Sequence, residues 1–283
     1  MSAAASTSGA GAEEEYEERD VTVRGTRVRL LAAGSGEPLL YLHGSGDLGL
    51  WFPALTRLAR THRVYRPDHP GFSGSDDGDG IDSVHDLAFF YLDLLDEIAA
   101  DEVVVVGSSL GGWIAADLAT IEPRRVSRLV LVNAVGVRAE VPTPDMFTHS
   151  PVELAELVYH DDDLRSAAMR RAREMEDDPA LFERYLRNQI STAHLGWNPY
   201  MHDPKLPARL HRITAPTLIL WGASDRLVPA GYAQRWAELL PKAEVAVIDD
   251  AGHLPLIERP DAALGVLRAF LGQGGSGAKG STP

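Results

Sequence analysis

The chain contains no cysteine, no long hydrophobic run and few positive charges. The absence of cysteine excludes disulfides, thiolate metal ligands and a cysteine nucleophile, and it leaves the redox compartment open. The longest purely aliphatic run, Val103 to Val106, is far shorter than the roughly 20 residues that span a bilayer. Lys and Arg number 27 against 41 Asp and Glu, which gives a formal net charge of −14. Nucleic acid phosphates and anionic lipid repel such a chain, so we expect neither nucleic acid nor a membrane as a partner.

The two ends of the sequence look unlike the rest. Residues 1–19 are mostly small residues followed by glutamates, and residues 273–283 are rich in Gly and Ser. Neither stretch has enough apolar surface to offset the entropy of ordering, so we interpret both as disordered tails. The start also lacks a positively charged stretch followed by an apolar one, so we see no secretory signal and expect a cytoplasmic protein.

Between the tails, predicted strands alternate with predicted helices. Several strands are short continuous apolar runs, which are typical of strands buried on both faces of a parallel sheet. The alternation predicts an α/β fold with a mostly parallel eight-stranded sheet and helices on both faces. We expect the strands at Val21–Val23, Arg27–Ala32, Leu39–Leu42, Arg63–Arg66, Val103–Val106, Leu129–Val132, Thr217–Trp221 and Val245–Ile248. We expect the main helices at Ser83–Ala99, Leu110–Ile121, Gly231–Leu240 and Asp261–Leu271.

Residues 138–212 interrupt this alternation, because they carry only amphipathic helical pattern. We expect three helices there, at residues 152–158, 163–175 and 179–190. The segment leaves the sheet at the carboxyl end of a strand, where open α/β sheets bind ligands. We therefore interpret it as a lid rather than as a decoration packed away from the site. The core then has two parts, residues 20–137 and 213–272.

The segment VGSSLGG, residues 106–112, carries the pattern G-x-S-x-G with Ser109 at its centre. An aliphatic strand precedes it and an apolar helix follows, as in a sharp strand-to-helix turn that exposes the central serine. The flanking residues must be small because the chain passes close to itself there. We predict Ser109 as a nucleophile. Ser108 lacks a glycine two positions before it, and we expect it to hold the turn or line the pocket.

A serine hydroxyl is a weak nucleophile that needs a base, and the base needs a group that orients it. His253 follows the last predicted strand and is the candidate base, while Asp225 follows the preceding strand and is the candidate acid. Asp249 and Asp250 compete with Asp225. They lie so close before His253 that reaching its Nδ1 atom requires a tight turn, so we favour Asp225. The chain order Ser, Asp, His is the one expected of this turn.

The oxyanion of a tetrahedral intermediate needs hydrogen-bond donors. We predict the backbone N–H of Leu110 as one donor. The other is expected from the loop HGSG after the strand that ends at Leu42, with Ser45 as first choice and Gly46 as second. We interpret His43 as a brace of this loop rather than as a catalytic base.

The predicted lid offers aromatic side chains for a mid-sized hydrophobic ligand. The residues expected to line the substrate pocket are His43, Ser108, Trp113, Phe147, Trp197, Tyr200 and Leu254. The acidic stretches at residues 76–79 and 161–163 are interpreted as solvated loops, because no complete calcium-binding pattern follows them.

Five segments together resemble the landmark motifs of the α/β-hydrolase superfamily: LLYLHGSG (39–46), RPDHPGFSGSD (66–76), VVVVGSSLGGWIA (103–115), PTLILWGASDRLVP (216–229) and DDAGHLPLIERPDA (249–262). The resemblance implies an α/β-hydrolase fold and two-step acyl transfer to water, with no metal and no organic cofactor. It implies a nucleophile at Ser109, an acid at Asp225, a base at His253, and oxyanion donors at Ser45 and Leu110. One departure is His69, where similar proteins usually carry an apolar residue; it either packs against the surface or reaches the pocket mouth.

The fold does not define the substrate. A serine at the turn argues against haloalkane dehalogenases and epoxide hydrolases, which use aspartate there. The core resembles small lid-bearing esterases, lactonases and the carbon–carbon hydrolases that act on ring-cleavage dienoates. The first hypothesis is therefore hydrolysis of an ester, lactone or carbon–carbon bond. Two alternatives stay open: non-hydrolytic cyclase, lyase or perhydrolase chemistry at the same site, and a ligand-binding protein on a hydrolase scaffold. The sequence does not define the oligomeric state.

Overall fold

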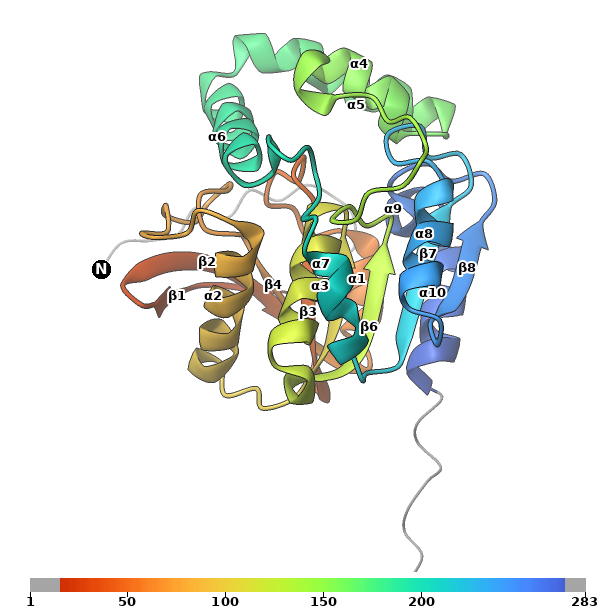
Figure 1. The fold of residues 1–283 in the computed structure, drawn as a ribbon. Helices are drawn as coiled ribbons and strands as arrows, with labels where there is room; N and C mark the ends of the chain where they lie inside the picture. The colour runs from red at the N-terminus through yellow and green to blue at the C-terminus, as the bar shows by residue number, and fades with distance from the viewer. Residues whose placement is uncertain (1–15, 273–283) are drawn as a thin grey trace, which may run out of the picture.

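The computed structural model describes residues 16–272, and one eight-stranded sheet forms their centre (Figure 1). The strands are β1 (Glu17–Val23), β2 (Thr26–Ala33), β3 (Glu37–Leu42), β4 (His62–Pro67), β5 (Val103–Ser108), β6 (Val126–Val132), β7 (Thr217–Gly222) and β8 (Glu244–Ile248). Their order in the sheet is β1-β2-β4-β3-β5-β6-β7-β8. The pairs β1·β2 and β2·β4 are antiparallel, and all the others are parallel. The predicted sheet is confirmed.

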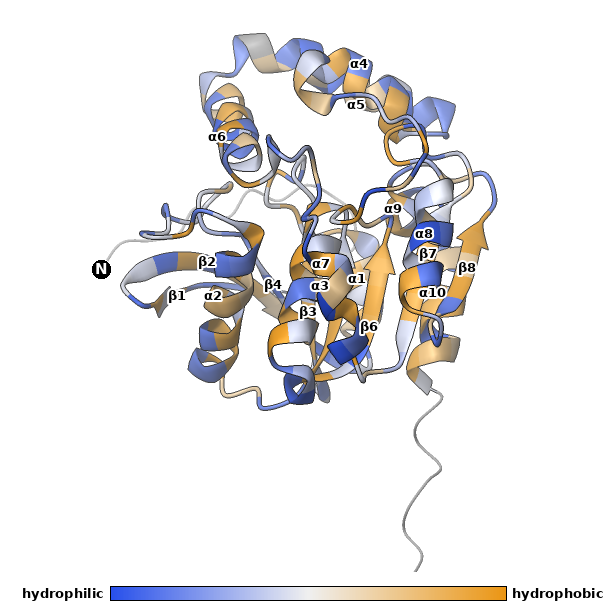
Figure 2. Cartoon of the chain, in the orientation of Figure 1, coloured by the Kyte–Doolittle hydropathy of each residue, from blue (hydrophilic) through white to orange (hydrophobic). Residues whose placement is uncertain are grey.

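Helices cover both faces of the sheet. The helices α2 (Val84–Glu97), α3 (Leu110–Ile121) and α8 (Gly231–Leu239) pack on one face. The helices α1 (Pro53–Leu58), α9 (Pro255–Glu258) and α10 (Pro260–Gly272) pack on the other. The run of four valines in β5 explains why both faces need cover: Val103 and Val105 join one apolar cluster, and Val104 and Val106 join the other. In Figure 2 the central strands are accordingly among the most hydrophobic parts of the chain.

The first strand begins earlier than the sequence predicted. We expected a tail up to residue 19, but β1 starts at Glu17, which pairs in the ladder with Ala32 and forms an ion pair with Arg63. Glu18 pairs with Arg29 at 2.7 Å. The sequence places Glu17 and Glu18 in an acidic tail, because only the folded chain shows that Arg63 and Arg29 are their partners. The rest of the tail predictions, residues 1–15 and 273–283, lies outside the described residues.

Residues 138–212, here called the helical insert, contain α4 (Pro151–Val158), α5 (Asp162–Glu174), α6 (Pro179–Gly196) and the short α7 (Leu206–Arg209). The three predicted helices are present, and α6 continues six residues past the predicted end because no helix breaker occurs before Gly196. Serine and aspartate side chains cap α4, α5 and α6 at their first turns. In Figure 1, α4, α5 and α6 lie above the carboxyl ends of the parallel strands.

A tight crossing anchors the start of α3 to the sheet. A Cβ atom on Gly111 would lie 2.1 Å from the carbonyl oxygen of Leu42 and 2.6 Å from that of His43. Both neighbours are backbone atoms, so a side chain at this position can be accommodated only if a strand end or the helix moves. The first turn of α3 is thus held against the end of β3.

We therefore expect Gly111→Ala to lower the free energy of unfolding by about 1–3 kcal/mol, the usual cost of overpacking. Gly265→Ala is the matched control, because Gly265 lies exposed within α10 and a Cβ atom there would have no neighbour within 4 Å. This control should gain up to about 1 kcal/mol from improved helix propensity. Urea denaturation followed by circular dichroism measures both changes. Equal stability of the two variants would contradict the close crossing.

Candidate active site

Ser109 occupies the strained turn between β5 and α3. Its backbone has φ 54° and ψ −115°, a conformation that costs energy for any residue with a side chain. Surrounding hydrogen bonds hold it: its N–H donates to Val132 at 2.9 Å, and its carbonyl accepts the N–H groups of Gly112, Trp113 and Val135 at 3.0 to 3.3 Å. The hydroxyl does not cap α3. The side chain that the motif singled out is therefore fixed in place and not used for capping.

The two motif glycines are required by contact distances. A Cβ atom on Gly107 would lie 2.2 Å from the carbonyl oxygen of Gly111, and Gly111 itself contacts the end of β3. Gly44 lies against Ser109, since a Cβ atom on Gly44 would be 3.2 Å from the Cβ atom of Ser109 and 3.9 Å from its Oγ atom. The turn thus brings the loop after β3 next to Ser109.

His253 and Asp225 form a buried pair at the same edge of the sheet. The Nδ1 atom of His253 lies 2.7 Å from Oδ2 of Asp225, and the two residues are 4% and 5% exposed. A carboxylate only accepts hydrogen bonds, so Nδ1 carries the proton and Nε2 is left as an acceptor. The rival Asp250 has a side chain that is 75% exposed and lies 3.6 Å from His160. The structure thus brings Asp225, and not Asp250, to His253.

Asn133 is a site residue that the sequence reasoning missed. It is completely buried directly after β6, with φ 45°, and its Nδ2 atom donates to Oδ2 of Asp225 at 2.6 Å. The other carboxylate oxygen accepts the N–H groups of Leu227 at 2.9 Å and Val228 at 2.8 Å. Four hydrogen bonds therefore fix the carboxylate of Asp225. The signal available in the sequence was an asparagine directly after a core strand, because asparagine adopts a left-handed backbone more readily than most residues.

The loop HGSG, residues 43–46, is here called the oxyanion loop after its predicted role, and its donors stay predictions. Ser45 is 8% exposed, and a Cβ atom on Gly46 would have no neighbour within 4 Å, so the loop is open at that point. Leu110 is the first residue of α3, and the first N–H groups of a helix have no partner within it. Leu110 follows Ser109 directly in the chain, and Ser45 follows Gly44, the residue that lies against the side chain of Ser109.

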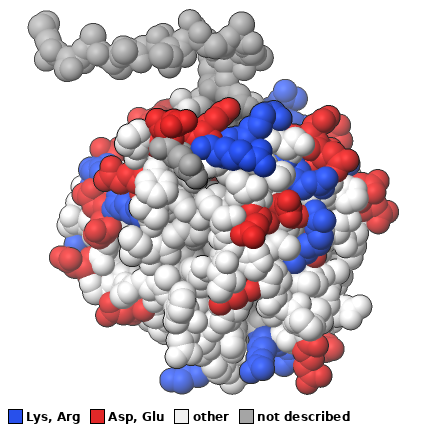
Figure 3. Space-filling view, turned by 90° about the horizontal axis from the view of Figure 1, so that it is seen from above, with Lys and Arg blue, Asp and Glu red and all other residues white. Residues whose placement is uncertain are grey.

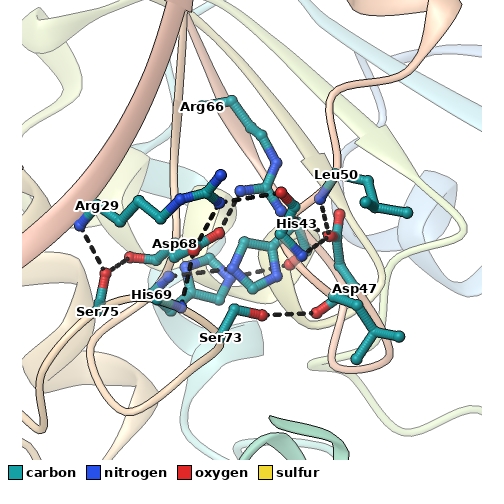
Figure 4. Close-up of polar contacts among 12 residues, drawn as sticks. Arg29, His43, Asp47, Leu50, Arg66, Asp68, His69, Ser73 and Ser75 are labelled. Carbon is teal, nitrogen blue, oxygen red and sulfur yellow. Dashed lines mark hydrogen bonds and ion pairs between the residues drawn. The ribbon is translucent and has the colours of Figure 1, made fainter. Parts of the chain in front are cut away.

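His43 braces this loop from behind (Figure 4). It is completely buried; Nδ1 donates to the carbonyl of Gly44 at 2.8 Å, and Nε2 accepts the N–H of His69 at 3.0 Å. Burial lowers the pKa of His43 to about 3, so the ring is neutral. The bracing interpretation thus agrees with the structure. The expectation that His43 also lines the substrate pocket was wrong, because its ring is enclosed and both nitrogens are occupied.

His69 completes the brace. Its Nε2 atom donates to the carbonyl of His43 at 2.9 Å, its Nδ1 atom contacts the hydroxyl of Tyr91, and the two imidazole rings stack with centroids 3.7 Å apart. Burial lowers the pKa of His69 well below its usual value. The sequence predicted that this unusual histidine packs at the surface or reaches the pocket mouth. Both expectations were wrong, because His69 is completely buried.

A buried ionic cluster supports the same loop. Arg66, which is completely buried, pairs with Asp68 and with Asp47 at 2.6 Å, and Asp47 also accepts the N–H groups of Gly49 at 2.8 Å and Leu50 at 3.3 Å (Figure 4). Burial raises the pKa of Asp68, but the charge of Arg66, its hydrogen bond and the N–H of Gly74 act together in the other direction, and the pKa falls to about 2. The cluster fixes the chain just beyond the oxyanion loop.

The aromatic residues predicted to line the pocket from the insert lie together. Phe147 lies 5.1 Å from Trp197 and 6.0 Å from Tyr200 between ring centroids. The hydroxyl of Tyr200 accepts the N–H of Met146 at 2.8 Å and donates to the carbonyl of Pro144 at 2.9 Å. Trp197 is 60% exposed, so most of its ring faces solvent.

Met146 is a second residue that the sequence reasoning missed. Its sulfur lies 4.0 Å from the hydroxyl of Ser45, and the residue is 7% exposed, so the insert contacts the oxyanion loop here. Nothing in the sequence marks this methionine, which fills irregular gaps in many proteins. The other predicted pocket residues are Ser108 and Trp113, both almost completely buried, and Leu254, which is partly buried before α9.

Among residues 16–272, no group of three or more His, Cys, Asp or Glu side chains could hold a metal ion. Over the same range, no helix is both long enough and apolar enough to cross a membrane. The face seen from above carries charges of both signs around an area without charged side chains, rather than one continuous positive patch (Figure 3).

Comparison with known proteins gives a consistent result. A family model described as the alpha/beta hydrolase family matches residues 39–265. The dihydrolipoyllysine-residue acetyltransferase component of an acetoin cleaving system from Cupriavidus necator is 31% identical over 262 residues, which cover 88% of this chain and 68% of the relative. The 2-hydroxy-6-oxo-6-(2'-aminophenyl)hexa-2,4-dienoic acid hydrolase from Metapseudomonas resinovorans is 27% identical and covers 92% of both chains.

A solved structure of 2-hydroxy-6-oxo-6-phenylhexa-2,4-dienoate hydrolase from a Rhodococcus species shares the fold. Its TM-score is 0.76 at 23% identity, over 91% of this chain and 99% of that one. Because the family model covers most of the chain, and the sheet and the sharp turn agree with it, this protein belongs to the alpha/beta hydrolase family.

Proposed function

We propose that the protein is a serine hydrolase that cleaves an ester, lactone or carbon–carbon bond in a mid-sized hydrophobic small molecule. The observation that carries the proposal is the buried pair of His253 and Asp225, 2.7 Å apart, at the sheet edge where Ser109 occupies its strained turn. Relatives named as hydrolases of 2-hydroxy-6-oxo-dienoates support the substrate class.

The chemistry follows from the roles of these three residues. Nε2 of His253 takes the proton of the Ser109 hydroxyl as its oxygen attacks the substrate carbonyl, and Asp225 stabilises the imidazolium. The N–H groups of Leu110 and Ser45, with Gly46 as the alternative to Ser45, stabilise the oxyanion. Collapse of the intermediate gives the His253 proton to the leaving group and leaves an acyl group on Ser109. A water molecule, deprotonated by His253, then releases the acid and restores the hydroxyl.

We propose that the helical insert serves as a lid and that the two core segments, residues 20–137 and 213–272, form the catalytic body. Buried contacts between the insert and the core support this. The side chain of Asn188 in α6 accepts the N–H of Ser73 at 2.8 Å and donates to the carbonyl of Asp47 at 2.6 Å. Met146 faces Ser45 from the same insert. The insert therefore borders the loop that is next to the nucleophile.

The experiment that tests the proposed function is labelling with a small fluorophosphonate, run beside a panel of p-nitrophenyl esters of increasing acyl length. A serine hydrolase forms a stable adduct at Ser109 and releases p-nitrophenol. A protein that only binds ligands does neither.

Ser109→Ala should abolish ester hydrolysis while the fold is kept. We expect a fall in kcat of about 10⁴-fold or more, because the remaining rate comes only from binding and the oxyanion donors. Steady-state kinetics with the best ester of the panel measures the change, and circular dichroism checks the fold. A variant that keeps more than about a tenth of the activity would show that Ser109 is not the nucleophile.

Asp225→Asn should cost about 10⁴-fold in kcat, because an amide donor at this position favours the wrong tautomer of His253. Asp250→Asn is the matched control, since Asp250 is exposed and lies away from His253. We expect the control to stay within about twofold of the wild type, as for a surface substitution. A larger loss of kcat in Asp250→Asn than in Asp225→Asn would show that Asp225 is not the acid.

Met146→Ala should change the preference between bulky and small esters. The sulfur contacts Ser45, so its removal opens space beside the oxyanion loop, and one apolar contact is worth about a tenfold change in the ratio of kcat/KM values. Trp197→Ala is the comparison, and we expect it to change that ratio less because its ring is 60% exposed. If Trp197→Ala has the larger effect, the pocket lies on the aromatic side of the insert.

A further inference from the structure

One short stretch of the helical insert contacts both loops that carry the proposed acid and base. This stretch, residues 157–161, joins α4 to α5 and is here called the cap strap. The carbonyl of Val158 accepts the N–H of His253 at 2.7 Å. The carbonyl of Leu157 accepts the N–H of Arg226, the residue after Asp225, at 3.3 Å. The guanidinium of Arg226 donates to the carbonyl of Tyr159 at 2.9 Å.

The side chain of Glu258 joins the cap strap to the His253 loop. Glu258 lies in α9 and is 5% exposed. Its Oε1 atom accepts the N–H of Gly252 at 2.7 Å, and its Oε2 atom accepts the N–H groups of His160 at 2.7 Å and Asp161 at 2.9 Å. One carboxylate thus accepts three backbone N–H groups from two segments that are about 90 residues apart in the sequence.

The packing at this point leaves little room for movement. A Cβ atom on Gly252 would lie 2.3 Å from the carbonyl oxygen of Val158 and 2.9 Å from the nitrogen of His160. The backbone before His253 therefore lies directly on the cap strap, and Glu258 lies at the edge of that contact. Any lengthening of these hydrogen bonds displaces the residue that precedes the imidazole.

We infer that Glu258 is a positioning residue: it holds the His253 loop on the cap strap so that the imidazole keeps its place between Asp225 and Ser109. Glu258 touches neither the substrate nor the reacting atoms, and it acts through the backbone of Gly252. The inference rests on the proposed function, because it assigns Glu258 a role for the base of that mechanism.

The chemistry explains why a carboxylate is needed. Both of its oxygens are acceptors, which matches donors on both sides. Glutamine has nearly the same shape, but its NH₂ group would face at least one of the three N–H groups. A buried donor would lose its partner, and the segment that carries it would move until water or another acceptor replaced the bond.

The test compares Glu258→Gln with Glu153→Gln. Glu153 lies exposed in α4 of the same insert and also accepts a backbone N–H, from Ser150 at 2.8 Å, but it contacts neither catalytic loop. The measurements are the rate constant for fluorophosphonate labelling of Ser109, kcat and KM for a p-nitrophenyl ester, and the melting temperature. Hydrogen exchange of the backbone amides of Gly252 and His253 reports the loop itself.

For Glu258→Gln we expect kcat and the labelling rate constant to fall about 10- to 100-fold with KM unchanged, as for a small displacement of a catalytic group. Exchange at Gly252 and His253 should become faster, while Glu153→Gln keeps the wild-type rates. A folded Glu258→Gln variant with wild-type kcat and labelling rate overturns the inference, even when its melting temperature is lower, because a purely structural role predicts that result.

Two further outcomes are decided by the same set of measurements. If Glu258→Gln does not fold, Arg226→Ala is measured in its place, because this variant removes one exposed hydrogen bond to the cap strap. A fall in kcat of about two- to tenfold supports the coupling between the cap strap and the site, and an unchanged kcat overturns it.

A wild-type protein that is not labelled contradicts the proposed function instead. In that case, unchanged hydrogen exchange at Gly252 and His253 in Glu258→Gln also overturns the role of Glu258. Faster exchange at these two amides supports the inference that Glu258 holds the His253 loop.

Discussion

The close passage of α3 across the end of β3 is the constraint on which the rest of the site depends. Gly111 lies so close to the carbonyl groups of Leu42 and His43 that no side chain fits between them. The start of α3 is therefore packed directly against the loop after β3. This contact requires the sharp turn that holds Ser109 at φ 54°. It also brings Gly44 against the side chain of Ser109. The strained backbone of Ser109 and the position of its neighbouring loop are therefore both tied to this one close contact.

Buried polar groups then hold the parts on either side of this crossing. On one side, His43, His69 and Arg66 pair with backbone and carboxylate partners behind the oxyanion loop. On the other side, Asn133 and the N–H groups after Asp225 hydrogen-bond to the carboxylate oxygens of Asp225. An unpaired polar group in such surroundings is costly, whereas a satisfied network is rigid. The site is thus preorganised by groups that do not themselves react.

The sequence alone predicted the parts of this structure that local pattern encodes. The eight strands, the turn at Ser109 and the pairing of His253 with Asp225 follow from apolar runs, glycine spacing and chain order. Asn133 was missed because its partner is 92 residues away, and a single asparagine after a strand has no local pattern. The early start of β1 was missed for the same reason, since Glu17 gains its partner Arg63 only in the fold. The helices α1 and α9 have six and four residues, too few for a periodicity to show.

The contacts of the helical insert divide it into parts with different physical roles. Its α6 end is tied to the core by Asn188 and by Ser191, whose hydroxyl donates to the carbonyl of Gly71 at 2.7 Å. The cap strap ties it to the loops of His253 and Arg226. Between these anchors, α5 has no fully buried residue and packs mainly on α4. A segment with few buried contacts opens at a lower free energy than its anchored ends. Local opening is therefore least costly at α5, and it leaves both anchors in place.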